Sequence, residues 1–249
     1  MTLTEFAQQS STAPTLPLRV ALFLDGADLD DMEAAARAGV VEGFTTNPTL
    51  VAKAGVSDYR GFAAEALARV KGAPISFEVL ADDLPTMAAQ AREIASWGPR
   101  VSVKVPVSTT AGEPTLEIVR DLTREGLSIN VTAVMTMEQV AGVADCVDPD
   151  VQTFVSIFAG RIADTGRDPC PFMREAVEIC RHKPNLRVLW ASPREVLNVY
   201  QADACGVQVI VLTAELLSKL ALRNKDLAEF SRETVKMFYT DAVKAGYTL

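Results

Sequence analysis

The chain is poor in the residues that metal sites and disulfide scaffolds need. It contains one histidine and four cysteines in 249 residues. His182 stands in the polar segment CRHKPN, which is typical of a surface position. Cys146, Cys170, Cys180 and Cys205 show no CxxC or other close metal-ligand spacing. We therefore expect reduced thiols and no metal site.

Long runs of positive charge and long apolar runs are also missing. The net charge is −8, which argues against sequence-independent binding of nucleic acid. A few local arginines can still bind a small anion. No apolar run approaches the roughly 20 residues of a membrane span. The opening MTLTEFAQQSSTAPTLP lacks the basic and apolar regions of a signal peptide. We expect a cytoplasmic protein in which residues 1–18 form a polar, partly disordered lead-in.

What the chain has is a regular alternation of β-branched runs and helical segments, which predicts right-handed βαβ units and a parallel sheet. The expected strands lie in RVALFLDG, VEGFTTNP, PISFEVLA, RVSVKVPV, LSINVTAV, VQTFVSIF, LRVLWAS and VQVIVLT. This pattern predicts an α/β fold, a single (β/α)8 TIM barrel over residues 19–249 with an extra C-terminal helix in LAEFSRETVKMFYTDAVKAG. A doubly wound sheet is the alternative, but the glycine-rich loops GxGxxG and GxxxxGK[ST] are absent.

Polar or otherwise unusual side chains stand near the ends of seven of these strands. In a (β/α)8 barrel the active site lies at the C-terminal ends of the strands, so we expect these side chains to converge on one pocket. They are Asp25; Thr45, Thr46 and Asn47; Glu78; Lys104; Asn130 and Thr132; Ser156, Phe158 and Arg161; and Ser192 and Arg194.

Lys104 is the most informative of them, because it interrupts the apolar segment VSVKVPVS. A buried ammonium is costly unless it is paired or loses its proton. An ion pair with a carboxylate such as Glu78 is the structural explanation. The chemical explanation is a neutral amine that attacks a ketone, forms a Schiff base and so allows cleavage of a neighbouring C–C bond.

The other polar residues could complete such chemistry. Asp25 and Glu78 could move protons, directly or through a water held with Thr132. Charge-assisted hydrogen bonds to a phosphate could come from Arg161, Ser192 and Arg194. Each also has a simpler explanation: a helix cap for Asp25, for which Asp28 is the better candidate; turn chemistry for Thr45, Thr46 and Asn47; and exposed surface for the two arginines.

An ordered set of motifs resembles the transaldolase family, most closely its small members, which include the fructose-6-phosphate aldolases. The motifs are LFLDGADLDDM, GFTTNPTLVAKAG, ISFEVLA, VSVKVPV, INVTAVMT, VSIFAGRIADTG and WASPREV, and the resemblance covers nearly the whole chain from about residue 20. It implies a (β/α)8 barrel and a class I, Schiff-base mechanism of sugar-phosphate metabolism that uses no cofactor and no metal.

The resemblance also implies roles. Lys104 matches the Schiff-base lysine, Asp25 the proton-transfer aspartate, and Glu78 and Thr132 the pair that orients the catalytic water. The implied substrate contacts are Thr45, Asn47, Asn130, Ser156 and Phe158, and the implied phosphate contacts are Arg161, Ser192 and Arg194. In small transaldolases the C-terminal helix packs on a neighbouring subunit, so a homo-oligomer, a pentamer or decamer, is expected; packing on its own barrel is the alternative.

Two positions favour transfer over simple cleavage within this family. The aldolase branch has glutamine where this chain has Glu78 and tyrosine where it has Phe158. A tyrosine hydroxyl can deliver a proton and release free dihydroxyacetone, whereas phenylalanine cannot. We therefore predict a transferase that moves a dihydroxyacetone unit from a ketose, such as fructose 6-phosphate or sedoheptulose 7-phosphate, to an aldose.

Three alternatives stay open. One is a lyase that releases free dihydroxyacetone, and another is a non-catalytic sugar-phosphate binding protein. The third is a transaldolase specialised for a modified or sulfonated sugar, because the chain departs from the family pattern around the expected contacts. These departures are Gly26, Ile157, Trp190 and Pro193.

Overall fold

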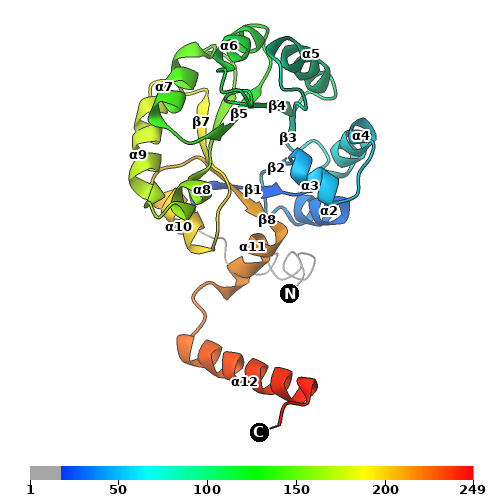
Figure 1. Cartoon of the computed structure of the whole chain (residues 1–249), viewed down its shortest axis with the longest axis vertical. Coiled ribbons are helices and arrows are strands. Elements are labelled where there is room, and N and C mark those ends of the chain that lie inside the picture. The colour runs from blue at the N-terminus through cyan, green and yellow to red at the C-terminus, as the bar shows by residue number, and fades with distance from the viewer. Residues whose placement is uncertain (1–17, 249) are drawn as a thin grey trace. The chain divides into compact units, whose positions relative to one another are not determined.

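The computed structural model describes residues 18–248, and the expected lead-in lies almost wholly outside them. Eight parallel strands pair in chain order and close on themselves, which confirms the predicted (β/α)8 barrel (Figure 1). The strands are β1 (Ala21–Asp25), β2 (Gly43–Thr45), β3 (Ile75–Glu78), β4 (Val101–Pro106), β5 (Ile129–Val134), β6 (Thr153–Ile157), β7 (Leu186–Trp190) and β8 (Val209–Thr213). Each lies within a segment expected from the sequence.

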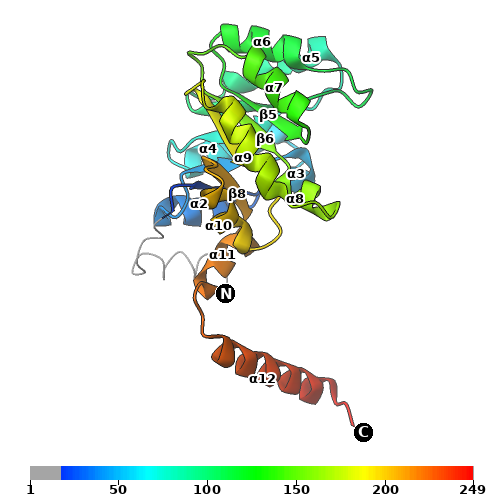
Figure 2. The same cartoon turned by 90° about the vertical axis from the view of Figure 1, so that its left-hand side faces the viewer.

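Helices lie outside the strands in both views of the barrel (Figures 1 and 2). They are α2 (Leu29–Ala38), α3 (Pro48–Lys53), α4 (Tyr59–Arg69), α5 (Leu84–Ala95), α6 (Leu116–Arg124), α7 (Met137–Cys146), α8 (Ala159–Asp164), α9 (Pro169–Cys180), α10 (Leu197–Ala204) and α11 (Ala214–Lys219); the 3-10 helix η1 (Leu220–Leu222) follows in the second unit of the chain. The short helices α3 and α8 are not predicted by the sequence pattern, and both follow strands that carry expected site residues.

Local signals in the sequence explain where the first helix begins and ends. The side chain of Asp28 caps α2 by accepting hydrogen bonds from the backbone N–H groups of Asp30 and Asp31, at 2.9 and 3.0 Å. Gly39 ends α2 with a φ of 65°, a conformation that glycine adopts without strain. Asp25 is thus free of the capping role, as the sequence suggested.

Strand alternation decides which side chains face the inside of the barrel. Phe77 on β3 packs edge-to-face against the rings of Tyr59 and Trp97, at centroid distances of 6.3 and 5.5 Å, so it faces the helices. Its neighbour Glu78 therefore faces the interior, because successive strand residues point to opposite sides. Glu78 is in register with Lys104 of β4, which brings both charged side chains inside the barrel.

The chain divides into two compact units, one that ends at Ser218 and one that begins at Lys219. The second unit contains α12 (Leu227–Ala245), the expected C-terminal helix, which is a continuous helix in Figure 2. None of its residues is buried, and its exposed large apolar side chains include the expected Leu227, Phe230, Val235, Phe238, Tyr239 and Val243. Across residues 18–248, every helix is too short or too polar to cross a membrane.

Candidate active site

Lys104 lies near the middle of β4 with only 9% of its side chain exposed. Its Nζ is 3.1 Å from Oε2 of Glu78, whose side chain is 16% exposed, and it donates a 2.9 Å hydrogen bond to the backbone carbonyl of Thr46. The ion pair that the sequence offered as a structural explanation is therefore present. It also places a carboxylate within proton-transfer distance of the amine, which is the arrangement a latent nucleophile needs.

Tyr59, at the start of α4, fixes the backbone of Glu78 from the helix side. Its hydroxyl accepts a 2.9 Å hydrogen bond from the Glu78 N–H and donates one of 3.2 Å to the Glu78 carbonyl. Burial raises the pKa of Tyr59 to about 12, so the hydroxyl keeps the proton that it donates. Tyr59 was not predicted from the sequence, because a tyrosine at the start of a helix resembles an ordinary packing residue.

Asp25 ends β1 and lies in register with Thr45 of β2. The Thr45 hydroxyl donates a 2.7 Å hydrogen bond to Asp25 Oδ1. Burial raises the pKa of Asp25, and this effect outweighs the opposing influences of the Lys104 charge and the Thr45 hydrogen bond. A carboxylate with a raised pKa is a stronger base, which suits a group that must take up a proton during a reaction.

β5 is irregular at the point where it delivers two expected site residues. The pairing of β5 with β6 shifts between Val131 and Val134, and Ala133 has a φ of 62°. A bulge of this kind re-aims the adjacent side chain, here that of the buried Thr132. No sequence signal marks the bulge, since alanine rarely adopts a positive φ.

Asn130 of β5 links side chains from two other strands. Its Nδ2 donates a 3.2 Å hydrogen bond to Ser76 Oγ on β3, and its Oδ1 accepts one of 2.6 Å from Ser156 Oγ on β6. All three residues are buried, so this network joins strands across the barrel interior. Ser76 was not expected at the site, although its two-residue spacing from Glu78 puts it on the same face of β3.

Asn47 has a structural role that the sequence also allowed. It caps α3, and its Oδ1 accepts a 3.0 Å hydrogen bond from the N–H of Leu50, with Pro48 following in the first turn. The cap uses the oxygen of the side chain and leaves the amide N–H2 group as a donor. Asn47 can therefore hold the start of α3 and still donate to a substrate hydroxyl.

A second group of expected residues, Arg161, Ser192 and Arg194, follows β6 and β7, and we call it the anion clamp. Arg194 donates through Nη1 to Ser192 Oγ at 3.1 Å and forms a bidentate pair with Asp164 of α8. The pair raises the pKa of Arg194 and lowers that of Asp164. Asp164 was not predicted from the sequence. With this carboxylate beside its two arginines, the clamp carries one net positive charge.

Close backbone packing holds Ser192 in place. Ser192 has a φ of 60°, which is unusual for a residue with a side chain. A Cβ atom on Gly160 of α8 would lie 1.5 Å from the Ser192 carbonyl oxygen, so only glycine permits this approach. The glycine of the SIFAGR segment thus allows the close approach that positions Ser192.

Arg161 is exposed and stacks over a ring that borders the barrel interior. Its guanidinium carbon is 5.3 Å from the centroid of the Phe158 ring. Phe158 packs against the buried cluster that includes Phe23 and Phe154, so the ring position is fixed by the core. Together with Arg194, the Arg161 charge lowers the pKa of Asp164, so both arginines and this carboxylate act in one region.

Two of the departures from the family pattern lie in the packed layer. Ile157 and Trp190 are in register on β6 and β7, and both are fully buried. The inward-facing residue of β6 next to them is Ser156, so Ile157 points away from the site.

Within the described part of the chain, no group of three or more His, Cys, Asp or Glu residues could hold a metal ion.

Comparisons with known proteins show the fold and the family of this chain. Solved barrels share the fold at low identity, including KGPDC from Streptococcus mutans, with a TM-score of 0.55 and 10% identity over 80% of this chain and 89% of that one. A "Probable transaldolase" from Dehalococcoides mccartyi is 36% identical over 205 residues, or 80% of this chain and 89% of the relative. Another with that name, from Roseiflexus sp. (strain RS-1), is 37% identical over 199 residues, or 80% and 88%.

The family described as Transaldolase/Fructose-6-phosphate aldolase matches residues 22–249, which include every expected site residue. The chain belongs to the transaldolase/fructose-6-phosphate aldolase family, and it is a transaldolase-type enzyme.

Proposed function

We propose that this enzyme transfers a dihydroxyacetone unit from a ketose phosphate to an aldose through a Schiff base on Lys104. The observation that carries the proposal is the enclosed contact between Lys104 Nζ and Glu78 Oε2, at 3.1 Å, with the amine also held by the Thr46 carbonyl. Stability alone does not require this pair, because apolar side chains in place of both Lys104 and Glu78 would cost little in stability.

The first step is proton transfer from the Lys104 ammonium to Glu78. The resulting amine attacks the ketone carbon of the donor and forms a carbinolamine. Loss of water from this adduct gives the iminium ion, with the proton for the departing hydroxide supplied by Glu78, directly or through a water held with Thr132. The carbonyl of Thr46 keeps the nitrogen oriented throughout, because it accepts a hydrogen bond from each protonated form.

Asp25 is placed for the cleavage step. It removes the proton from the hydroxyl on the carbon that will leave, the C–C bond breaks, and its electrons flow into the iminium to give an enamine. The bond to Thr45 and the charge of Lys104 orient and stabilise the Asp25 carboxylate, while burial makes it a stronger base. The enamine carbon then attacks an acceptor aldehyde, and Asp25 returns its proton to the new hydroxyl. Hydrolysis of the resulting iminium ion frees the product and Lys104.

Phe158 favours transfer over release. Free dihydroxyacetone forms when the enamine carbon is protonated, and a phenylalanine ring has no proton to give. The ring is fixed between the core and the guanidinium of Arg161, and it offers no hydroxyl at this position of the site. The enamine should therefore persist until an acceptor arrives.

We propose that the anion clamp binds the phosphate of donor and acceptor, through Arg161 and through Ser192 with Arg194. We further propose a cytoplasmic homo-oligomer, a pentamer or decamer. The four cysteines are free thiols, which suits a reducing compartment, and α12 exposes large apolar side chains along its length.

The test is whether turnover of the donor requires an acceptor. With fructose 6-phosphate alone, free dihydroxyacetone should form slowly; adding erythrose 4-phosphate should give rapid formation of sedoheptulose 7-phosphate. Phe158→Tyr should raise acceptor-independent release at least tenfold, whereas Phe230→Tyr on α12 should not. Rapid release of dihydroxyacetone by the unaltered enzyme without an acceptor would contradict transfer and favour the lyase.

A further inference from the structure

The hydrogen-bond ladder between β2 and β3 stops just before Glu78. The Thr46 N–H donates a 3.1 Å hydrogen bond to the carbonyl of Ser76. In a parallel pair the bonding groups recur every second residue, so the next two bonds would run from residue 48 to the Glu78 carbonyl and from the Glu78 N–H to the Thr46 carbonyl. Residue 48 is a proline, which has no N–H to donate. The regular ladder therefore cannot satisfy both backbone groups of Glu78.

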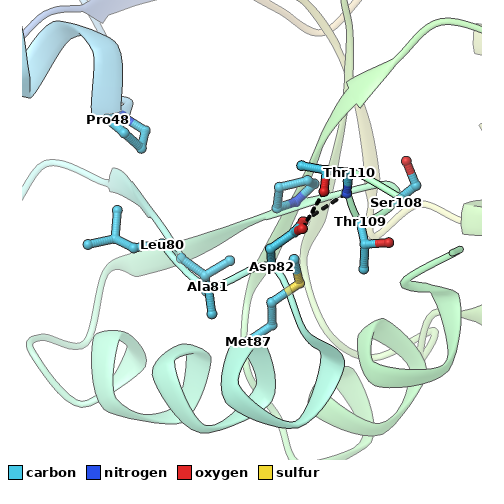
Figure 3. A pocket seen from close by; sticks show the side chains of 10 residues that line it. Pro48, Leu80, Ala81, Asp82, Met87, Ser108, Thr109 and Thr110 are labelled. Atoms are coloured by element: carbon cyan, nitrogen blue, oxygen red, sulfur yellow. Dashed lines mark hydrogen bonds between the residues drawn. The ribbon is translucent and has the colours of Figure 1, made fainter. Parts of the chain in front are cut away.

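The chain leaves the sheet at this proline. Pro48 occupies the first turn of α3, apart from Leu80 and Ala81 in the loop after β3 (Figure 3). A pocket of about 410 Å³ is lined both by Pro48 and by Val79, the residue after Glu78. β2 and β3 thus separate at the level of Glu78, where a group from outside the two strands must satisfy the β3 backbone.

Tyr59 supplies both of the bonds that the ladder lacks. Its hydroxyl accepts from the Glu78 N–H at 2.9 Å, in place of the Thr46 carbonyl, and donates to the Glu78 carbonyl at 3.2 Å, in place of the missing proline N–H. One hydroxyl can do both, because it is a donor and an acceptor. The rings of Phe77 and Trp97 pack edge-to-face on the Tyr59 ring, at centroid distances of 6.3 and 5.9 Å, and hold it in this position.

The carbonyl of Thr46 is consequently left for Lys104. Thr46 is fully buried, and its carbonyl accepts the 2.9 Å hydrogen bond from Lys104 Nζ. A carbonyl held in the ladder lies near the plane of the sheet, whereas the Lys104 side chain stands on the inner face of the sheet. If the Glu78 N–H bonded to this carbonyl, the carbonyl would turn towards β3 and away from the amine.

We propose that Tyr59 is a positioning residue for Lys104: its hydroxyl occupies the backbone of Glu78, and this frees the Thr46 carbonyl to orient the amine. Tyr59 lies on the helix side of β3, so it acts through the backbone and does not touch the reacting atoms. The effect on catalysis rests on the Schiff-base function proposed above, whereas the exchange of hydrogen-bond partners does not.

The experiment measures how fast Tyr59→Phe forms the imine. Enzyme and dihydroxyacetone are mixed, borohydride is added at timed intervals, and the Lys104 adduct is quantified by peptide mass spectrometry over a range of dihydroxyacetone concentrations. The maximal rate should fall about ten- to hundredfold, because a misplaced nucleophile costs that much. The half-saturating concentration should stay within about threefold, since Tyr59 does not touch the ketone. An unchanged maximal rate, or a loss confined to the half-saturating concentration, would overturn the proposal.

Two control variants separate this effect from a loss of stability. Tyr200→Phe removes another buried hydroxyl, one that has no hydrogen-bond partner among residues 18–248. Val143→Ala opens a cavity beneath α7 and should lower the unfolding temperature by an amount similar to that of Tyr59→Phe. Neither control should change the maximal rate more than about twofold. If Val143→Ala slows imine formation as much as Tyr59→Phe does, the loss reflects stability and the proposal is wrong.

A crystal structure of Tyr59→Phe tests the exchange of partners without any substrate. We expect the Glu78 N–H to donate to the Thr46 carbonyl and Lys104 Nζ to lie beyond hydrogen-bond distance from it. A Thr46 carbonyl still bound by Lys104 would overturn the proposal. If Tyr59→Phe does not fold, Tyr59→Phe/Pro48→Ala, which returns a backbone donor to residue 48, takes its place in both measurements. Absence of any adduct in the unaltered enzyme would contradict the proposed function, and the crystal structure would then decide the positioning role alone.

Discussion

Two cation–carboxylate pairs in this barrel have similar chemistry and opposite surroundings. The side chains of Lys104 and Glu78 are 9% and 16% exposed, and those of Arg194 and Asp164 are 46% and 52% exposed. Enclosure makes removal of one partner costly for the first pair, because the other charge stays behind in a poorly solvated place. Water screens the second pair, so Arg194 can give up Asp164 for a ligand.

The comparison suggests a division of labour. The inner pair is held on two strands in register, and in the proposed function it serves the chemical steps, which need fixed geometry. The outer pair is held on a short helix and a loop, and in the proposed function Asp164 competes with the substrate phosphate for Arg194. Changes to the inner pair should therefore abolish catalysis, and changes to the outer pair should tune affinity.

The largest effect is expected for Lys104→Met. Loss of the nucleophile should reduce kcat on the order of 10⁴-fold or more, as removal of a covalent catalyst does in other enzymes. The variant should also unfold at a lower temperature, because Glu78 keeps a charge without its cation. Lys53→Met on the exposed end of α3 is the control, and it should alter neither quantity. A turnover number within tenfold of the unaltered enzyme would refute the central role of Lys104.

Asp25→Asn should separate activity from stability. Turnover should fall about 10²- to 10⁴-fold through loss of the base. Because the pKa of Asp25 is raised in the folded protein, its ionised form opposes folding, and this penalty appears as the pH rises through the raised pKa. The variant should therefore be more stable than the unaltered enzyme at pH 7, with the gain vanishing towards about pH 3. Thermal unfolding at both pH values measures this, and lower stability of the variant at pH 7 would contradict the pKa direction.

Gly160→Ala should weaken phosphate binding by the anion clamp and leave the chemistry at Lys104 intact. The added Cβ collides with the Ser192 carbonyl, so the loop after β7 must shift at a cost of about 1–3 kcal/mol. We expect KM for fructose 6-phosphate to rise at least tenfold, while labelling of Lys104 by unphosphorylated dihydroxyacetone stays within twofold. The control is Gly98→Ala, whose new Cβ would have its nearest contact at 3.5 Å. Equal losses with both substrates would show that Gly160 supports the whole barrel.

The smallest effect is expected for Asp164→Asn. Removing this carboxylate frees Arg194 and raises the net charge of the anion clamp by one. KM for fructose 6-phosphate should fall two- to fivefold, since the pair is exposed, and the gain should shrink as salt is added. Steady-state kinetics at low and high ionic strength would measure this. An increase in KM would mean that Asp164 orients Arg194 for the ligand and does not compete with it.

The sequence predicted the residues carried by regular strands better than those carried by loops. Lys104 and Glu78 interrupt apolar runs at positions where a charge is unusual. Because alternate strand residues face the same side of the sheet, the barrel fold is enough to bring the two side chains together. The bulge at Ala133 and the left-handed conformation of Ser192 have no comparable signal, because neither alanine nor serine favours a positive φ.

Partners that act from outside the strands were also beyond sequence reasoning. Tyr59 reaches Glu78 from a helix 19 residues earlier, and Asp164 reaches Arg194 from a short helix 30 residues earlier. These contacts depend on how helices pack on the barrel and on the lengths of loops, which periodicity does not encode.

The most direct test of the account is borohydride trapping on the unaltered enzyme. The protein is incubated with fructose 6-phosphate, reduced, digested and analysed by peptide mass spectrometry, with dihydroxyacetone as a second substrate. The account predicts a reduced adduct on Lys104 and on no other lysine. An adduct elsewhere, or none with either substrate, would contradict it.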